Sequence, residues 1–388
     1  MRKLLFLFVL PVFVLAGTGC DMDDDSGYDT LLVGLVDVSE MRFSFFNESL
    51  AINTRLALAD SSENGVLTKA GKKVRIQFLT MPMVDKPEAP RQTIYETVNT
   101  YGAQVIIGGA RSKTAVNMAR AAEELHVPFL ATTATAPAVT KGTRYTFTTS
   151  PSTDVQAVYY AFFLHNILKI KRIALLVEED TLFAADFADA LRLNHMDNGG
   201  QISAVRYFST AEDIPSRLPD LVDSEPEAIV FCAIHPHSFV VGRRLEELGF
   251  HRPLLSIHSR QAFTYLEHMP QPDMPVYYLS YWNPADQSSI NREYVRNFKE
   301  TTGREPTEDD AMVYDTMLRL IQAVRDAESL SPDALQKSLA LRATMSGAVG
   351  HYSFIPETTL QYVWSLGILD GKLIINEIHS PLPKLRQH

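Results

Sequence analysis

The chain has 388 residues, of which 46% are hydrophobic and 21% are charged, as is typical of a globular protein. A chain of this length more often forms two domains than one. The 36 basic and 46 acidic residues give a net charge of -10, and no run of Lys and Arg stands out. This balance argues against a general nucleic-acid binder, which needs a basic face.

Residues 1–20 are typical of an export signal. A basic start, Arg2-Lys3, precedes an almost purely apolar stretch at residues 4–16, and small residues lead to Cys20. The apolar stretch is too short for a transmembrane helix. The only other cysteine in the sequence is Cys232, so we expect no disulfide within the exported domain.

The cysteine that follows these small residues resembles the lipobox cysteine of bacterial lipoproteins. The resemblance implies that Cys20 is lipidated and anchors the protein to a membrane. Gly17 stands where a lipobox usually has a large aliphatic residue, and the alternative is ordinary cleavage nearby that yields a soluble periplasmic protein. Residues 21–28 form an acidic tether with nothing to bury. In the lipoprotein families that this segment resembles, an Asp directly after the cysteine, here Asp21, often marks retention on the inner membrane.

The first part of the exported chain alternates strands and helices. Apolar runs predict strands at residues 31–36 and 73–79, and helical spacing predicts helices at residues 49–59 and 94–101. The next unit, residues 104–135, contains a strand, a Gly-Gly turn, a helix, a second strand and a cluster of Thr. This alternation is typical of a doubly wound parallel sheet.

Three hydroxyl side chains follow the two strands of the 104–135 unit. Ser112 stands at the expected N-cap of the helix, and Thr133 and Thr135 follow the second strand. Open α/β sheets bind ligands at the carboxyl ends of their strands. We therefore expect these three hydroxyls to hold a ligand. The alternative is that Ser112 only caps its helix and the Thr residues only form turns.

A second lobe repeats the alternation after an extended segment at residues 146–151, where we expect the chain to cross between lobes. Predicted helices lie at residues 156–168, 182–196, 211–221 and 239–248, and predicted strands at 172–177, 202–207, 228–233 and 254–257.

The last part of the chain contains the expected second and third crossings. A Pro-rich stretch leads to a strand at residues 276–281 and a loop at 282–284; further predictions are helices at 291–300, 308–327 and 331–341, a turn and strand at 347–354, and a hairpin within 363–375. These crossings divide the chain into an N-terminal lobe, residues 29–149 plus 283–349, and a C-terminal lobe, residues 150–282 plus 350–388.

Several short motifs are distributed over nearly the whole exported chain. They are IIGGARS (106–112), VPFLATTATAPAVT (127–140), TSPSxDxQ (149–156), HP (235–236), LEELGF (245–250), YDT (314–316) and DGKLI (370–374). In this order and spacing they resemble the type I periplasmic binding proteins of the leucine/isoleucine/valine-binding family, the solute receptors of ABC transporters. The resemblance implies two Rossmann-like α/β lobes, joined by three hinge crossings, that close over a ligand.

The resemblance also implies two kinds of partner and a binding site. The partners are a small-molecule carboxylate, which is the ligand, and the transmembrane subunits of an ABC permease. In amino-acid-binding members, groups of the two loops discussed above hold the ligand α-carboxylate, which assigns this role to Ser112, Thr133 and Thr135. Neutral donors at a helix N-terminus suit an anion because they need no buried countercharge.

Other positions depart from the amino-acid-binding pattern. A first-loop aromatic of the family falls near Ser44, which Phe43, Phe45 and Phe46 flank; a Tyr-Gly pair falls on Phe183 and Ala184; the residue before His-Pro is Ile234; and the acid that binds the ligand ammonium falls on His258. A buried ammonium without an acid partner is costly. The sequence therefore argues against a simple zwitterionic amino acid, unless Asp37, Asp180 or Asp286 supplies the acid.

His258 and Arg260 instead suit a second polar or anionic group on the ligand. An apolar or aromatic ligand body would then lie between Phe183, Ile234 and the first-loop phenylalanines. The alternative for His258 is a surface or core histidine with no ligand.

No motif indicates catalysis. The sequence lacks G-x-S-x-G, P-loop, G-x-G-x-x-G and H-E-x-x-H patterns. His235 and His237 flank a proline with no acid nearby, which is weak evidence for a metal. The acidic stretch 178–180 is more typical of a solvated loop than of a general acid pair. We expect a monomer with no enzyme activity, cofactor or metal. A sensory module that presents the ligand to a membrane signalling partner remains the alternative to transport.

Overall fold

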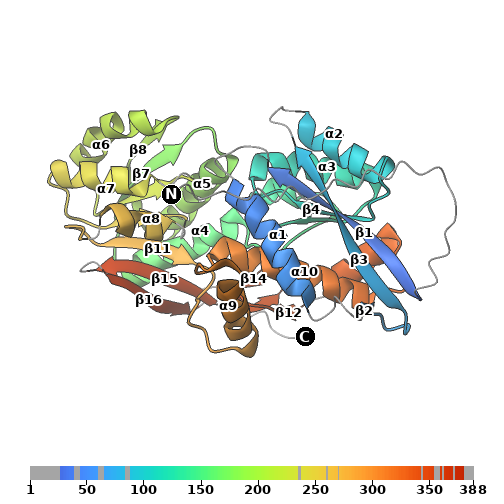
Figure 1. Ribbon diagram of the computed structural model, residues 1–388. Coiled ribbons are helices and arrows are strands. Elements are labelled where there is room, and N and C mark those ends of the chain that lie inside the picture. Colours follow the sequence, from blue (N-terminus) through green and yellow to red (C-terminus); the bar gives the residue numbers. More distant parts are fainter. Residues whose placement is uncertain are drawn as a thin grey trace, which may run out of the picture.

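The computed structural model describes residues 27–38, 44–59, 65–83, 88–234, 237–258, 261–269, 271–341, 344–353, 359–360, 362–369 and 372–379. Cys20, Phe43, the His235-Pro236 pair, Arg260 and the turn at 370–371 lie outside these residues. Two lobes lie side by side in Figure 1, each built around a sheet with helices packed on it. The predicted α/β fold class with two Rossmann-like lobes is confirmed.

The first sheet has the strand order β2-β3-β1-β4-β5-β6. Its strands are β1 (Tyr28–Val38), β2 (Val66–Leu67), β3 (Lys73–Met83), β4 (Val105–Gly108), β5 (Phe129–Ala131) and β6 (Thr146–Thr148). All pairs are parallel except that of β2 with β3. All four residues of β4 are buried, as expected for an apolar strand that is covered on both faces.

Helices cover both faces of this sheet. One face packs against α2 (Ala89–Asn99) and α3 (Ser112–Leu125). The other packs against α1 (Ser44–Leu58), α10 (Glu308–Asp326) and α11 (Pro332–Leu341). Apolar residues of α10 therefore join the core of a sheet whose strands all end more than a hundred residues earlier in the chain. Figure 1 shows α10 beside α1 and the first-lobe strands.

The second sheet has the order β16-β15-β11-β10-β9-β7-β8. Its strands are β7 (Arg172–Glu178), β8 (Gln201–Phe208), β9 (Ala228–Cys232), β10 (Leu254–Ser256), β11 (Val276–Ser280), β15 (Tyr362–Leu369) and β16 (Lys372–His379). The first five pair in parallel, and the C-terminal hairpin of β15 and β16 adds to β11 in the antiparallel direction.

Successive residues of β7 enter different cores, which shows that both faces of this sheet are covered. One core includes α4 (Thr153–Phe162), the π-helical turn Phe163–Ile167 and α5 (Leu182–Asp197). The other includes α6 (Ile214–Asp223), α7 (Ser238–Glu247) and α8 (Gln261–His268). Helix α8 was not expected; Ala262 and Tyr265 pack it into the core, and tertiary packing of this kind stabilises a short helix beyond its local propensity.

The chain passes between the two sheets after β6, after β11 and before β15. The second passage leads to α9 (Ser289–Thr302) and α10, and the third includes a small sheet of β12 (Thr344–Ser346), β13 (His351–Ser353) and β14 (Thr359–Leu360). Helix α10 contributes to both cores, since Met312 packs in the second lobe and Val313 in the first.

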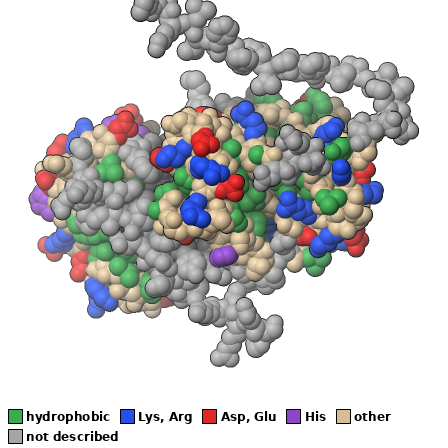
Figure 2. All heavy atoms as spheres, turned by 60° about the horizontal axis from the view of Figure 1, so that its bottom comes forward, with side chains coloured by type: hydrophobic (Ala, Val, Ile, Leu, Met, Phe, Trp, Pro, Cys, Tyr) green, Lys and Arg blue, Asp and Glu red, His purple; other side chains and the backbone are tan. Residues whose placement is uncertain are grey.

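The described surface is mixed in charge. On the face shown in Figure 2, basic and acidic side chains are interspersed with apolar ones. Among the described residues, no helix combines the length and the apolar character needed to cross a membrane.

Candidate ligand-binding site

A pocket lies between the lobes, at the carboxyl ends of parallel strands from both sheets. Its empty space is about 780 Å³, part of which is open to solvent. Six of the residues predicted to bind the ligand line this pocket: Ser112, Thr133, Thr135, Phe183, Ile234 and His258. Ser44 is the first residue of α1, but its side chain lies outside the described part of the structure. The fold thus brings together residues that are widely separated in the sequence.

The turn after β4 depends on glycine. Gly109 has a φ of 70°, and a Cβ there would lie 2.8 Å from Cζ of Phe129 and 3.0 Å from Cβ of Ala115. A side chain would therefore meet both backbone strain and steric overlap. The glycine lets the loop turn close to the sheet and begin α3 at the pocket.

Ser112 does not cap α3, so the predicted N-cap is wrong by one residue. The N-cap is Arg111, and Ser112 is the first helical residue. The buried Oγ of Ser112 accepts hydrogen bonds from the backbone N–H groups of Thr135 (3.4 Å) and Ala136 (3.2 Å). The side chain therefore connects the two ligand-side loops, and its own O–H remains available as a donor.

The loop after β5 is also held by hydrogen bonds to the loop after β4. The hydroxyl of Thr133 donates to the carbonyl of Ala110 (3.3 Å), and the N–H of Thr132 donates to that of Gly108 (2.9 Å). At the start of α3, the first intrahelical bond is that of Ala115 N–H to Arg111. The preceding N–H groups have no partner within the helix, so this end of α3 favours an anion.

Two basic residues that were not predicted as site residues stand beside these donors. Arg111 and Lys113 line the pocket on either side of Ser112. Their positive charges add to that of the helix N-terminus. The first-lobe face of the pocket, which we define as residues 110–113, 133 and 135, therefore has the chemistry expected for holding a carboxylate.

The second-lobe face is mainly apolar. Phe183 at the start of α5 is 9% exposed and packs edge-to-face on His258, with 6.4 Å between ring centroids and an interplanar angle of 78°. Ile234, Ile257 and Leu279 also line this side. His258 is half-buried and lies at the pocket wall, so it is neither a fully exposed nor a core histidine.

The acidic stretch at the end of β7 is only partly the solvated loop that the sequence suggested. Glu178 is 2% exposed, and its carboxylate accepts a hydrogen bond from the N–H of Ile234 (2.9 Å). This bond fixes the loop after β9 at the pocket. Glu179 and Asp180 are exposed, and Asp180 lines the pocket. The pattern showed three acids in a row but not which of them turns inward.

A third face of the pocket was missed by the sequence reasoning. It comes from the end of β11 and the first turn of α10, and we define this α10 face as Tyr281, Glu308, Asp309 and Met312. The hydroxyl of Tyr281 is buried, and none of the described residues is a hydrogen-bond partner for it. Burial raises the pKa of Tyr281 well above its ordinary value, and the charge of Glu308 adds to this effect.

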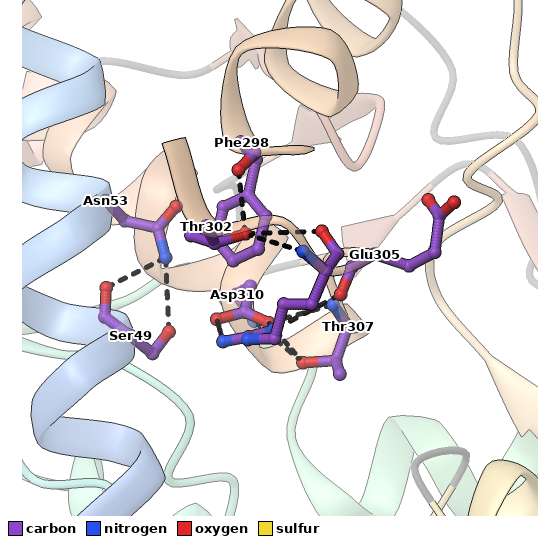
Figure 3. Close-up of polar contacts among 8 residues, drawn as sticks. Ser49, Asn53, Phe298, Thr302, Glu305, Thr307 and Asp310 are labelled. Atoms are coloured by element: carbon purple, nitrogen blue, oxygen red, sulfur yellow. Dashed lines mark hydrogen bonds and ion pairs between the residues drawn. The ribbon is translucent and has the colours of Figure 1, made fainter. Parts of the chain in front are cut away.

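The first turn of α10 begins with a capping box. Thr307 caps the helix, Asp310 closes the box, and Asp310 also pairs with Arg304 at 2.8 Å and 3.2 Å. Figure 3 shows Thr307 and Asp310 together, with Ser49 and Asn53 of α1 nearby. Burial opposes ionisation of Asp310, but bonds from Arg304, Ser49 and Thr307 outweigh it and lower the pKa. The T-E-D-D motif at 307–310 was the available sequence signal for this turn.

Two α/β lobes with a pocket between them, at the carboxyl ends of their strands, define the class of bilobal solute-binding proteins. The family model described as periplasmic binding protein matches residues 32–360, and the chain belongs to this family. The predicted family is thereby confirmed. It consists of solute-binding proteins rather than enzymes and implies an extracytoplasmic location.

Solved structures with the same fold belong to similar proteins. The leucine-binding protein LivK from Thermotoga maritima has a TM-score of 0.77 and 18% identity, covering 91% of this chain and 99% of that one. LivJ from Streptococcus pneumoniae, in complex with isoleucine, has a TM-score of 0.77 and 16% identity, covering 90% and 100%. A solute-binding protein of an ABC transporter from Rhodopseudomonas palustris, in complex with 3,4-dihydroxybenzoic acid, has a TM-score of 0.74 and 16% identity, covering 90% and 98%. A comparison with curated protein sequences finds no match.

Proposed function

We propose that the protein is the receptor of an ABC importer and binds a small carboxylate in the pocket between its lobes. The ligand class is an amino acid, an amino-acid-like compound, or an aromatic or aliphatic acid. The observation that carries this proposal is the first-lobe face, where a helix N-terminus, three hydroxyl side chains and two basic residues meet in one pocket. Similar proteins hold isoleucine and 3,4-dihydroxybenzoic acid, which both carry a carboxylate.

Each predicted residue has a role in this proposal. Ser112 and Thr135 donate hydrogen bonds to the carboxylate, and Thr133 does so by turning its O–H from the carbonyl of Ala110 to the ligand. Phe183 and Ile234 contact the apolar body of the ligand, and His258 faces a further polar group. The proposed site is thus divided between lobes, so that each lobe contributes contacts of a different chemical kind.

We propose that the lobes are residues 29–149 plus 283–349 and residues 150–282 plus 350–388, and that they close over the ligand. Leu182 at the start of α5 supports this proposal, because it packs against the apolar core of the first lobe. A ligand that contacts both lobes favours the closed state by the contacts it gains there. Residues of both lobes line the pocket, so a ligand bound there would contact both lobes.

The proposed setting is the periplasmic side of the inner membrane, with lipidated Cys20 as the anchor, a monomeric receptor and an ABC permease as partner. No catalytic activity is part of the proposal. Metabolic labelling with palmitate tests the anchor: label in the wild-type protein and none in Cys20→Ala is the expected result. Equal labelling of both would contradict it. No observation favours the alternative of a sensory module.

A thermal-shift screen of the purified domain tests the ligand class. Amino acids, aromatic acids, short fatty acids and dicarboxylates are compared at equal concentration, because a ligand that binds only the folded state raises the melting temperature. At least one carboxylate is expected to raise it. A rise with neutral solutes and with no carboxylate would overturn the proposal.

A further inference from the structure

We infer that Asp309 binds a cationic group of the ligand, so that the transported solute is an amino acid or another zwitterion rather than a simple carboxylate. This inference rests on the proposed function, since it assumes that the pocket is the solute site. It assigns to the α10 face the binding of the ligand ammonium, which the family pattern places at position 258.

Asp309 is a buried acid with an unused oxygen. Its side chain is 8% exposed and lines the pocket, and none of the described residues donates a hydrogen bond to Oδ2. A buried carboxylate oxygen normally accepts at least one hydrogen bond, because loss of water without a replacement is costly. A ligand donor in the pocket would supply the missing partner.

The neighbouring acids of the same helical turn are already compensated. Glu308 accepts a hydrogen bond from the hydroxyl of Ser280 (2.7 Å), and Asp310 is bound by Arg304 and closes the capping box. A position in the first turn of α10 stabilises the negative charge of Asp309 through the helix dipole. This effect accounts for the charge of Asp309 but gives Oδ2 no hydrogen bond, so the helix alone does not explain the residue.

A second unpartnered polar atom belongs to the same face. Tyr281 lines the pocket, and its buried hydroxyl has no hydrogen-bond partner among the described residues. A carboxylate and a hydroxyl oxygen both accept hydrogen bonds, and an ammonium group has three N–H donors to distribute between them. Asp309 and Tyr281 together therefore match a cationic donor better than they match a second anion.

The other candidate acids fit this role less well. Asp286 accepts a hydrogen bond from the N–H of Ser288 (2.9 Å) and is absent from the pocket lining. Asp180 lines the pocket but is exposed, so water already solvates it. The side chain of Asp37 lies outside the described part of the structure. Asp309 thus supplies the acid that is missing at His258, where the family pattern has an acid for the ligand ammonium.

The arrangement of charge also favours a dipolar ligand. The first-lobe face provides Arg111, Lys113 and the N-terminus of α3, whereas the α10 face provides Asp309 and Glu308. A ligand with one carboxylate and one ammonium can pair with both faces at once. A simple carboxylate would leave Asp309 buried and unpaired beside its own negative charge.

The test compares ligands that differ only in the amino group. Calorimetry with the purified protein uses the pairs L-leucine and 4-methylpentanoate, L-phenylalanine and 3-phenylpropanoate, and 5-aminopentanoate and pentanoate. In at least one pair the amino compound is expected to bind about tenfold to a hundredfold more tightly, the range for a hydrogen bond to a charged group. Equal or tighter binding of the compounds without the amino group would overturn the inference and leave the proposed function intact.

A matched variant then assigns the preference to a residue. Asp309→Asn keeps the size of the side chain, and Asp180→Asn removes an acid that lines the same pocket but is exposed. The preference for the amino compound is expected to fall at least fivefold in Asp309→Asn, because the amino compound loses its anionic partner and its partner acid is freed from the repulsion of Asp309, and to stay within twofold in Asp180→Asn. Retention of the full preference in a folded Asp309→Asn protein would contradict the assignment. Absence of binding by every carboxylate would instead overturn the proposed function, and the inference with it.

Discussion

On the first-lobe face of the pocket, Ser112 and Thr133 make hydrogen bonds that connect the loop after β4 with the loop after β5, whereas Asp309 and Tyr281 on the α10 face each keep a buried polar atom without a partner among the described residues. The first-lobe face is held together without a ligand by these hydrogen bonds, and its free N–H and O–H groups then donate to the ligand. The buried polar atoms of the α10 face cost folding free energy until a ligand forms hydrogen bonds with them. The difference indicates that one face is preformed and that the other gains most from the ligand.

Disruption of the turn at Gly109, which begins α3 at the first-lobe face, is expected to have the largest effect. Gly109→Val meets both left-handed backbone strain and overlap with Phe129, for a loss of about 2–5 kcal/mol in unfolding free energy. Urea denaturation measures this loss.

Gly102→Val is the matched control for this variant. Gly102 has a φ of 75°, and a Cβ there would have no heavy atom within 4 Å. It should therefore meet only the backbone strain, at about 1–2 kcal/mol. Equal losses in the two variants would show that close packing around Gly109 does not hold the first-lobe face.

A third buried acid on α10, Asp315, is a carboxylate whose hydrogen-bond partners are all present. Asp315 accepts hydrogen bonds from the N–H groups of Ala348 (2.6 Å) and Val349 (2.9 Å) and from the hydroxyl of Tyr352 (2.7 Å). It thereby fastens α10 to the third crossing. Burial raises the pKa of Asp315 from 3.8 to about 6, although the three hydrogen bonds oppose the rise.

The raised pKa of Asp315 predicts a pH-dependent stability. Because the folded state binds this proton more tightly than the unfolded state, the contribution is fully present below pH 3.8 and is lost as the pH rises through about 6. The loss corresponds to roughly 3 kcal/mol. The difference in unfolding free energy between the wild-type protein and Asp315→Asn should therefore be larger at pH 4 than at pH 7. A difference that does not change with pH would contradict the raised pKa.

The contrast between the two faces also explains what could be predicted from the sequence. The strand, turn and helix that present Ser112 follow from local apolar spacing and a Gly-Gly pair, and their bounds in the structure differ from those predicted by only a few residues. The hydroxyl cluster was recognisable because its residues stand close together in the chain. The alternation of strands and helices predicted the fold class because it, too, can be recognised from local sequence patterns.

The α10 face could not be predicted in this way. The spacing from Thr307 marks Asp310 as the capping-box acid, but nothing in the sequence separates Glu308 from Asp309, and these two differ because Ser280 donates a hydrogen bond to Glu308. The contact from Ser280 spans 28 residues and depends on how the second crossing is placed. Glu178 was misjudged for the same reason, since its partner Ile234 lies 56 residues away.

Two alanine variants are expected to separate binding from stability on the first-lobe face. Ser112→Ala and Thr135→Ala should each weaken carboxylate binding by about 1–3 kcal/mol, because a charged acceptor loses a donor. Only Ser112→Ala should also lower the melting temperature of the free protein, since Ser112 Oγ is the acceptor for two backbone N–H groups. Calorimetry and thermal unfolding measure the two effects. Unchanged affinity in both variants would remove these residues from the site.

The smallest expected effect concerns His258, and it tests whether the two acid positions are interchangeable. His258→Glu places a carboxylate where the family pattern would have one, beside Phe183 and on a half-buried position. In the wild-type background it should change the preference for L-leucine over 4-methylpentanoate by less than about 1 kcal/mol, because Asp309 already provides the acid and a half-exposed charge is screened. In the Asp309→Asn background the same substitution should restore part of the lost preference. Equal changes in both backgrounds would mean that positions 258 and 309 act independently, and that the α10 face does not hold the ammonium group.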